Sequence, residues 1–275
     1  MALWGYLFDR YEHDCLADLA ELDRLAREAL GVSLGLVALS GRPYAELVGA
    51  PRPAAAVVLP YADSSRAALI EVLGEGRVAS APLPIGVIGT SLWLNSLAAA
   101  LGKDPRPLDA FLARERQLLP SLQRARGKLA PQLAAAVAAD APLAAALVGV
   151  LAELGVAAPL VFTLDRTLGG AKRVAADLDA LREAGGPAVP APAIVERPSA
   201  ERFAAAFADF SRAAPTPLLL APTTLANLAD RSRVATVEVS FPRCRDHALA
   251  PQPLCGFAGL AVLAGRIVNA VGRVT

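Results

Sequence analysis

Short apolar runs alternate with amphipathic helical stretches along the whole chain. Runs this short and this apolar are typical of strands that helices cover on both faces. In the first half the pattern predicts strands over residues 2–8, 33–39, 54–60 and 77–83. It predicts helices over 14–30, over about 87–101 and over about 107–125, and a further helix that begins at Asp63. Turn signals separate these elements, among them SGRPY (40–44) and GAPRP (49–53).

The second half repeats this alternation. Strands are predicted over 133–139, 158–163, 192–196, 217–221 and 234–240. Helices are predicted after Asp140, near 172–184, over 199–212, briefly after 221 and over about 256–271. Asp140 suits an N-cap, and Pro142 suits the first turn that follows it. Repeated strand–helix–strand units imply parallel sheets with helices on both sides.

The stretch RARGKLAPQ (124–132) is the best candidate for a boundary between the halves. We therefore expect an α/β fold of two Rossmann-like domains, residues 1–125 and 126–275, with parallel sheets flanked by helices and a cleft between them. Ligands bind at the carboxyl ends of parallel strands. The candidate cleft residues are Asp9, Tyr11, Ser40, Tyr44, Tyr61, Asp63, Thr163, Asp165, Thr223, Thr224, Cys244 and His247. A turn or capping role is the alternative for each of them.

Composition narrows the functional classes. The formal net charge is +1 and no block of like charge occurs, which argues against a nucleic-acid groove. The longest apolar run, 142–162, is broken by Glu153, Gly155 and Pro159, so it predicts a helix and a strand and no membrane span. The first residues lack the basic region of a signal peptide. Three cysteines without a CxxC spacing form no disulfide framework, and we expect a soluble, reduced, cytoplasmic protein.

Common catalytic and nucleotide motifs do not occur. The chain has no phosphate loop and no GxSxG elbow, and LGEGRV (73–78) carries only two glycines of a dinucleotide pattern. In YADSSRA (61–67), Ser64 and Ser65 stand beside Asp63, which we interpret as a helix cap. With two histidines in the chain, a Ser–His–Asp arrangement is disfavoured. His13 and Cys15 are interpreted as a surface and a core residue.

The stretch SFPRCRDHALAPQPLCGFAG (240–259) is the densest cluster of soft ligands. Cys244, Asp246, His247 and Cys255 fall within twelve positions. A metal or cluster site needs three or four converging ligands. The gaps of 3 and 8 residues between Cys244, His247 and Cys255 match no common zinc or ferredoxin spacing. The alternatives are a metal site and a loop that closes the fold.

Residues 237–271 resemble the C-terminal signature of nitrogenase component 1 proteins. The shared elements are Phe241-Pro242 after a strand, Asp246-His247 in a polar loop, and Gly256-Phe257 with Gly259 before a closing helix. Segments 83–103, 109–155 (with an "ER" pair) and 215–242 resemble further segments of the family in the same order. The resemblance is greatest to the beta-type subunits, namely the molybdenum–iron protein beta chain, the second subunit of the cofactor-assembly scaffold and the subunits of dark-operative protochlorophyllide reductase.

The resemblance implies partners and a cofactor. Such subunits pair with an alpha-type partner or with themselves, and receive electrons from an ATP-dependent iron–sulfur reductase; an iron–sulfur cluster shared with the partner would be the cofactor. Family members have three Rossmann-like domains, and this chain begins at what resembles the second, without the first, cysteine-bearing domain. Alpha-type subunits hold their cofactor with a Cys after a middle-domain strand and a C-terminal His; Pro60 stands near that Cys position, and His247 lies in the matching loop.

Three interpretations follow. The chain is a subunit of a nitrogenase-like oxidoreductase complex or of its cofactor-assembly scaffold, and not a catalyst alone. Alternatively, it is a cluster-free small-molecule-binding or interaction module derived from that fold, or a fragment with displaced boundaries. The candidate cofactor-binding residues are Tyr61, Asp63, Cys244 and His247, and the candidate metal ligands are Cys244, His247 and Cys255.

Overall fold

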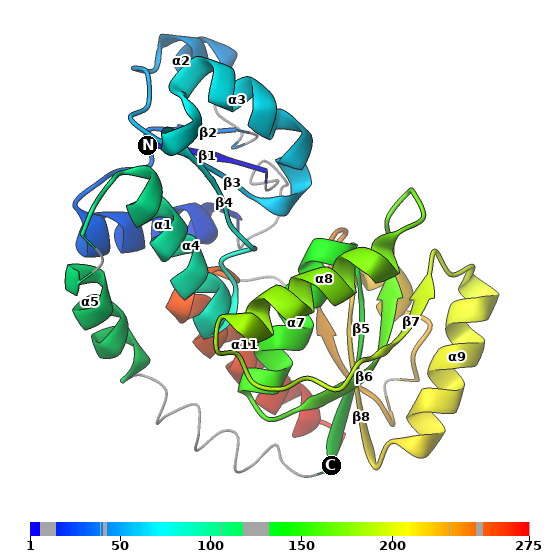
Figure 1. The fold of residues 1–275 in the computed structure, drawn as a ribbon. Coiled ribbons are helices and arrows are strands. Elements are labelled where there is room, and N and C mark those ends of the chain that lie inside the picture. The colour runs from blue at the N-terminus through cyan, green and yellow to red at the C-terminus, as the bar shows by residue number, and fades with distance from the viewer. Residues whose placement is uncertain are drawn as a thin grey trace. The chain divides into compact units, whose positions relative to one another are not determined.

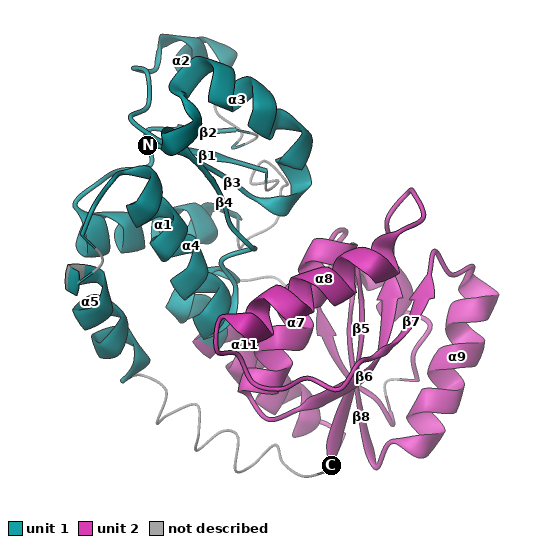
Figure 2. Cartoon of the chain, viewed as in Figure 1, with its two compact units in different colours: residues 1–118, 248–260 teal, residues 119–247, 261–275 magenta. Residues whose placement is uncertain are grey.

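The computed structural model describes residues 1–5, 15–38, 40, 43–104, 106–117, 132–230, 232–245 and 250–274. The chain forms two compact units, drawn in different colours in Figure 2. Unit 1 comprises residues 1–118 and 248–260, and unit 2 comprises 119–247 and 261–275. Each unit holds one parallel sheet with helices packed on it (Figure 1). The predicted α/β class with two parallel, helix-flanked sheets is therefore confirmed.

Unit 1 is built on a sheet of four short strands in the order β2-β1-β3-β4. The strands are β1 (Ala2–Trp4), β2 (Leu36–Val37), β3 (Ala56–Val58) and β4 (Val78–Ser80). The helices are α1 (Cys15–Leu30), α2 (Tyr44–Gly49), η1 (Pro60–Ser65), α3 (Arg66–Leu73), η2 (Glu75–Arg77), α4 (Gly86–Ala100) and α5 (Arg106–Arg116). Part of the core comes from Ala56 and Val58 of β3, which pack with Leu73 of α3 and Val78 of β4.

Unit 2 has a sheet of five strands in the order β7-β6-β5-β8-β9. The strands are β5 (Leu133–Ala139), β6 (Ala157–Thr163), β7 (Ala193–Glu196), β8 (Thr216–Ala221) and β9 (Ala235–Glu238). The helices are α7 (Ala141–Glu153), α8 (Gly170–Glu183), α9 (Ala200–Ala213) and α10 (Thr223–Ala226). Helix α11 (Gly256–Val271) begins in unit 1 and belongs to unit 2 from residue 261 onward. On α9, Phe203 and Phe207 lie four residues apart and so share one face, and the Phe203 ring lies 4.6 Å from that of Phe162 on β6.

Most predicted elements are confirmed, because buried strands and amphipathic helices leave clear periodic patterns. Helix α2 was missed, and none of its residues is buried, so it has no apolar stripe for the pattern to reveal. The predicted cap at Asp63 is wrong. Pro60 starts a 3₁₀ turn that runs through Asp63, and α3 begins only at Arg66, after Ser65. Residues 118–125 of the predicted helix over 107–125 lie outside the described residues.

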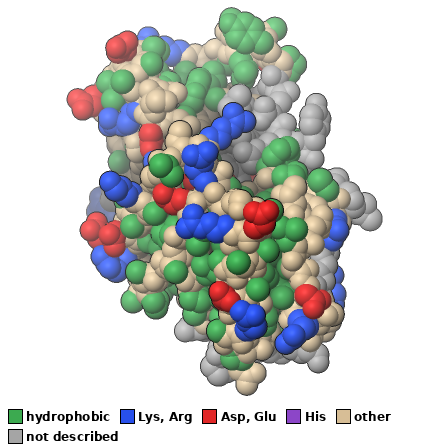
Figure 3. Space-filling model, turned by 90° about the vertical axis from the view of Figure 1, so that its right-hand side faces the viewer, with side chains coloured by type: hydrophobic (Ala, Val, Ile, Leu, Met, Phe, Trp, Pro, Cys, Tyr) green, Lys and Arg blue, Asp and Glu red, His purple; other side chains and the backbone are tan. Residues whose placement is uncertain are grey.

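None of the helices in the described part of the chain combines the length and apolar character needed to cross a membrane. On the face drawn in Figure 3, Lys and Arg side chains are interspersed with Asp and Glu and with hydrophobic groups. No extended area of one charge is visible among the described residues on that face.

Candidate functional site

In the parallel sheet of unit 2, the direction in which successive strands are added reverses between β5 and β8. The chain adds β6 and β7 on one side of β5 and then returns to add β8 and β9 on the other. The carboxyl ends of strands beside such a switch point form the usual ligand site of an open parallel sheet. Five of the predicted site residues lie at this edge: Thr163 at the end of β6, Asp165 after it, Thr223 and Thr224 after β8, and Cys244 in the loop after β9.

Thr223 joins the end of β8 to the loop after β9. Its hydroxyl donates to Glu238 Oε2 at 2.8 Å and accepts from the backbone N–H of Cys244 at 2.7 Å. The N–H of Thr223 donates to the carbonyl of Pro242 at 2.8 Å. Glu238 is buried and also accepts from the N–H of Arg245 at 3.1 Å. Residues 241–245 are therefore held to the strand ends by three hydrogen bonds, one of which is accepted by the Glu238 carboxylate.

Sequence reasoning missed Glu238. It lies inside the apolar run VATVEVS (234–240), where a carboxylate in a buried strand indicates a specific partner. Arg266 of α11 adds a further bond, since its guanidinium donates to the backbone carbonyl of Glu238 at 2.5 Å. The charged residue within an apolar strand was the signal that could have found this cluster.

Replacing Thr223 with valine is expected to lower the free energy of unfolding of unit 2 by about 2 kcal/mol. The valine methyl group cannot donate a hydrogen bond to the buried Glu238 carboxylate or accept one from the Cys244 N–H. Each lost hydrogen-bond partner costs about 1–3 kcal/mol, and relaxation of the structure offsets part of that cost. Faster amide hydrogen exchange in residues 241–245 measures the loss. The control is Thr224→Val, because the Thr224 side chain is exposed. Equal exchange in the two variants would contradict the role of the Thr223 hydroxyl.

The proposed metal ligands do not all lie in one described unit. The Cys244 thiol is exposed and belongs to unit 2, whereas Cys255 is buried and belongs to unit 1. His247, with Asp246, lies outside the described residues. Within the described ranges, no group of three or more His, Cys, Asp and Glu side chains could hold a metal ion. A metal site that uses Cys244, His247 and Cys255 remains a prediction.

Carboxylates of the chain occupy two helix N-termini at the ligand edge of unit 2. Asp165 Oδ2 accepts from the N–H of Ala141, at the start of α7, at 3.0 Å. Glu196 Oε1 accepts from Gly169 at 3.1 Å and from Ala171 at 2.7 Å, at the start of α8. Helix N-termini are where dinucleotide-binding folds hold phosphate. These positions are already filled, and this disfavours a nucleotide at this edge.

The closing helix α11 has its N-terminus capped in unit 1. Asp18 of α1 is 1% exposed, and its Oδ1 accepts from the N–H groups of Leu254 at 2.6 Å and Cys255 at 2.7 Å. Glu21 Oε1 accepts from the N–H of Ala258 at 3.3 Å. Anionic groups stabilise a helix N-terminus through its unpaired N–H groups and its dipole. The surroundings of Cys255 are thus those of a helix start inside a core.

The segments that resemble the family meet at this helix start. Gly256 donates its N–H to the carbonyl of Pro84 at 2.7 Å, and Ile85 forms a parallel bridge with Gly256. Residues 83–103 and 237–271 are therefore in contact within unit 1.

The "ER" pair of α5 also contacts this region. Glu115 Oε2 lies 3.4 Å from the Arg24 guanidinium, and Arg116 donates to Ser91 Oγ at 3.3 Å. Arg24 in turn binds Glu21 and Glu28 on its own helix. The pKa of Arg24 is raised above its usual range, chiefly by its hydrogen bond to Glu21. The network holds α1 against α5 and orients the Glu21 carboxylate.

The remaining candidates in unit 1 are dispersed. Tyr61 and Asp63 lie in η1 directly after β3, at the carboxyl edge beside the β1–β3 switch point. The buried Ser40 hydroxyl donates to the Val37 carbonyl at 2.8 Å, which is a turn role. Tyr44 is 81% exposed on α2. Asp9 and Tyr11 lie outside the described residues.

Comparison with known proteins identifies the relatives. The family model described as "Nitrogenase component 1 type Oxidoreductase" matches residues 10–272. A structure titled "Nitrogenase Cp1 at pH 6.5" superposes with a TM-score of 0.70 at 21% identity, over 98% of this chain and 59% of that chain. A second, "Nitrogenase Cp1 at pH 5", has a TM-score of 0.69 at 15% identity, over 98% and 56%. No curated protein matches the sequence. The chain therefore spans less than two thirds of these structural relatives.

Proposed function

Because the chain belongs to the nitrogenase component 1 type oxidoreductase family, we propose that it is a subunit of a nitrogenase-like oxidoreductase complex or of its cofactor-assembly scaffold, and not a catalyst alone. The observation that carries this proposal is the family match across residues 10–272. The structural likeness supports the fold, since identity of 21% at a TM-score of 0.70 leaves chemistry open. The activity and partners of a whole complex are part of the proposal.

An iron–sulfur cluster is the cofactor that this family implies. Its iron atoms are held by cysteine thiolates, usually four. The chain has three cysteines, and Cys15 and Cys255 are buried while Cys244 is exposed. The described residues do not fit a cluster held by this chain alone. A cluster in the complex would need ligands from the partner, with Cys244 as the exposed donor of this chain and His247 as its predicted neighbour.

The proposed partner is an alpha-type subunit or a second copy of this chain. An ATP-dependent iron–sulfur reductase would act on the assembled complex, which we place in the cytoplasm. A site completed by a partner is consistent with the fixed backbone of residues 241–245, which holds an exposed thiol at the ligand edge of unit 2.

The test is purification under anaerobic conditions from the native host, with bound partners retained. We expect a co-purifying subunit, together with iron and acid-labile sulfide that remain with the complex. Cys244→Ser is expected to lower the iron content, whereas Cys15→Ser, which changes a buried thiol at the start of α1, is the control. A chain that stays monomeric at high concentration, with no partner and no iron, would overturn the proposal.

The second candidate is a cluster-free module that binds a small molecule. In this candidate the small molecule would not be an anionic cofactor at the helix N-termini of unit 2, because Asp165 and Glu196 occupy those places. If the protein purified anaerobically contains no iron but still binds its partner, that result would support this alternative.

A further inference from the structure

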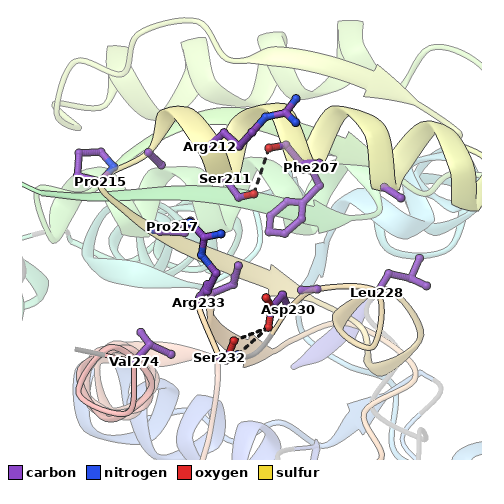
Figure 4. Close-up of a pocket in the computed structure, with 15 residues that line it drawn as sticks. Phe207, Ser211, Arg212, Pro215, Pro217, Leu228, Asp230, Ser232, Arg233 and Val274 are labelled. Atoms are coloured by element: carbon purple, nitrogen blue, oxygen red, sulfur yellow. Dashed lines mark hydrogen bonds between the residues drawn. The ribbon is translucent and has the colours of Figure 1, made fainter.

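A pocket of about 500 Å³ opens in unit 2, at the amino end of its sheet. Figure 4 shows it between the end of α9, the start of β8 and the connection from α10 to β9, with Val274 at one side. This is the opposite end of the strands from Thr223 and Glu238. The pocket is therefore separate from the ligand edge described above. Its volume lies within the range of about 300–1,000 Å³ that is typical of small-molecule sites.

The floor of the pocket is apolar. Phe207 and Val234 are buried and belong to the core cluster of unit 2, and Pro217 of β8 lies beside them. In Figure 4 the Phe207 ring points into the hollow. Leu228 forms one rim and is 48% exposed. Phe207 and Val234 are each only 4% exposed, so an apolar ligand body would gain by covering exposed lining side chains such as Leu228, at about 25 cal/mol per Å² of apolar surface removed from water.

One cationic group extends into the same hollow. In Figure 4 the Arg233 side chain runs from the turn before β9 toward Pro217 and Phe207. Within the described ranges, the Arg233 guanidinium forms no hydrogen bond and no ion pair. Arg212, the other arginine of the lining, is paired with Asp209 on its own helix. Arg233 therefore retains a full fork of N–H donors for a ligand.

The nearby carboxylate is held by other groups. Asp230 Oδ1 accepts from the hydroxyl of Ser232 at 2.7 Å and from its N–H at 3.0 Å. These bonds, with a smaller effect of the Arg233 charge, hold the pKa of Asp230 below its usual range. Asp230 is thus ionised at neutral pH. The Arg233 guanidinium is thus one cationic partner, which matches a ligand that carries a single carboxylate group.

We propose that this pocket binds a small organic carboxylate with an apolar body. The carboxylate would accept hydrogen bonds from the Arg233 guanidinium in the bidentate geometry that arginine favours. The hydrocarbon part lies over Phe207, Pro217 and Val234. The site would let a small molecule bind to the complex at the opposite end of the unit 2 strands from the loop that contains Cys244.

The test uses 3-phenylpropionate as the probe, with octanoate as a second shape and 3-phenylpropionamide as the neutral isostere. Binding to the full chain is measured by titration calorimetry and ligand-detected NMR. We expect saturable binding of at least one carboxylate, about tenfold or more tighter than the amide, since hydrogen bonds to charged groups are the strong ones. Arg233→Gln is expected to remove that preference.

Two tryptophan variants on α9 form a matched pair. Ala208 lines the pocket and Ala205 does not, and both side chains are exposed. Ala208→Trp is expected to fill the pocket and abolish binding, while Ala205→Trp and Arg202→Gln leave it unchanged. Equal affinity for acid and amide, binding that survives Ala208→Trp, or no saturable binding of either carboxylate at millimolar concentration would overturn the proposal. None of these outcomes affects the iron and partner measurements.

Discussion

Replacing Asp18 with alanine is expected to lower the free energy of unfolding of unit 1 by about 3–5 kcal/mol. The Asp18 carboxylate is 1% exposed and accepts two backbone N–H groups, from Leu254 and Cys255. A hydrogen bond to a charged acceptor contributes about 1.5–3 kcal/mol, and alanine would leave both donors buried without a partner. The start of α11 would also lose an anionic cap.

Tryptophan fluorescence measures this loss selectively. The two tryptophans of the chain, Trp4 and Trp93, lie in β1 and α4, both in unit 1, so their signal reports the unfolding of that unit in urea. Asp18→Asn keeps one acceptor oxygen and is expected to lose less. Asp109→Ala changes an exposed carboxylate on α5 and is the control. An Asp18→Ala midpoint within error of that control would refute the capping role.

The hydrophobic pattern predicted the sheets because it reflects local geometry. Strand β5 is buried along nearly its whole length and reads as an unbroken apolar run, LAAAVAA. The pattern could not place Asp18 in a core, because its hydrogen-bond partners lie 236 and 237 residues away along the chain. On sequence alone, Asp18 reads as a polar residue early in an amphipathic helix. Its burial follows from the return of residues 254–258 to unit 1.

Only part of the predicted site could be found from the sequence, because contacts between residues far apart along the chain leave no local pattern. Thr223 and Cys244 were found because both follow predicted strands, and the structure connects them by one hydrogen bond. Glu238 was overlooked because a carboxylate within a strand is normally on the solvent side. The residues 240–259 looked like a single cluster of ligands, yet the described part of this stretch divides between two units: Cys244 lies with unit 2 and Cys255 with unit 1.

Two glycines of α11 allow the effect of close packing to be distinguished from the effect of helix propensity. A Cβ on Gly259 would lie 2.2 Å from the carbonyl oxygen and 2.3 Å from the carbonyl carbon of Leu254. These are backbone atoms, and the N–H of Leu254 is bound to Asp18, so that segment has little freedom to shift. A Cβ on Gly265, in the same helix, would meet nothing within 4 Å, and this position is exposed. The same substitution should therefore have opposite effects at the two positions.

Gly259→Ala is expected to destabilise unit 1 by about 3 kcal/mol or more, since overpacking against a fixed backbone costs about 1–3 kcal/mol and occasionally exceeds that. Gly265→Ala is expected to stabilise the chain by about 0.5–1 kcal/mol, because alanine is the better helix former and restricts the unfolded chain. In thermal unfolding, tryptophan fluorescence follows the change in unit 1, and circular dichroism follows both variants, since Gly265 belongs to unit 2. If Gly259→Ala unfolds at the wild-type temperature, residues 254–259 do not pack as closely as described. In that case Gly259 would serve the flexibility of the helix start instead of its close packing. The segment that Asp18 binds would then not be rigid.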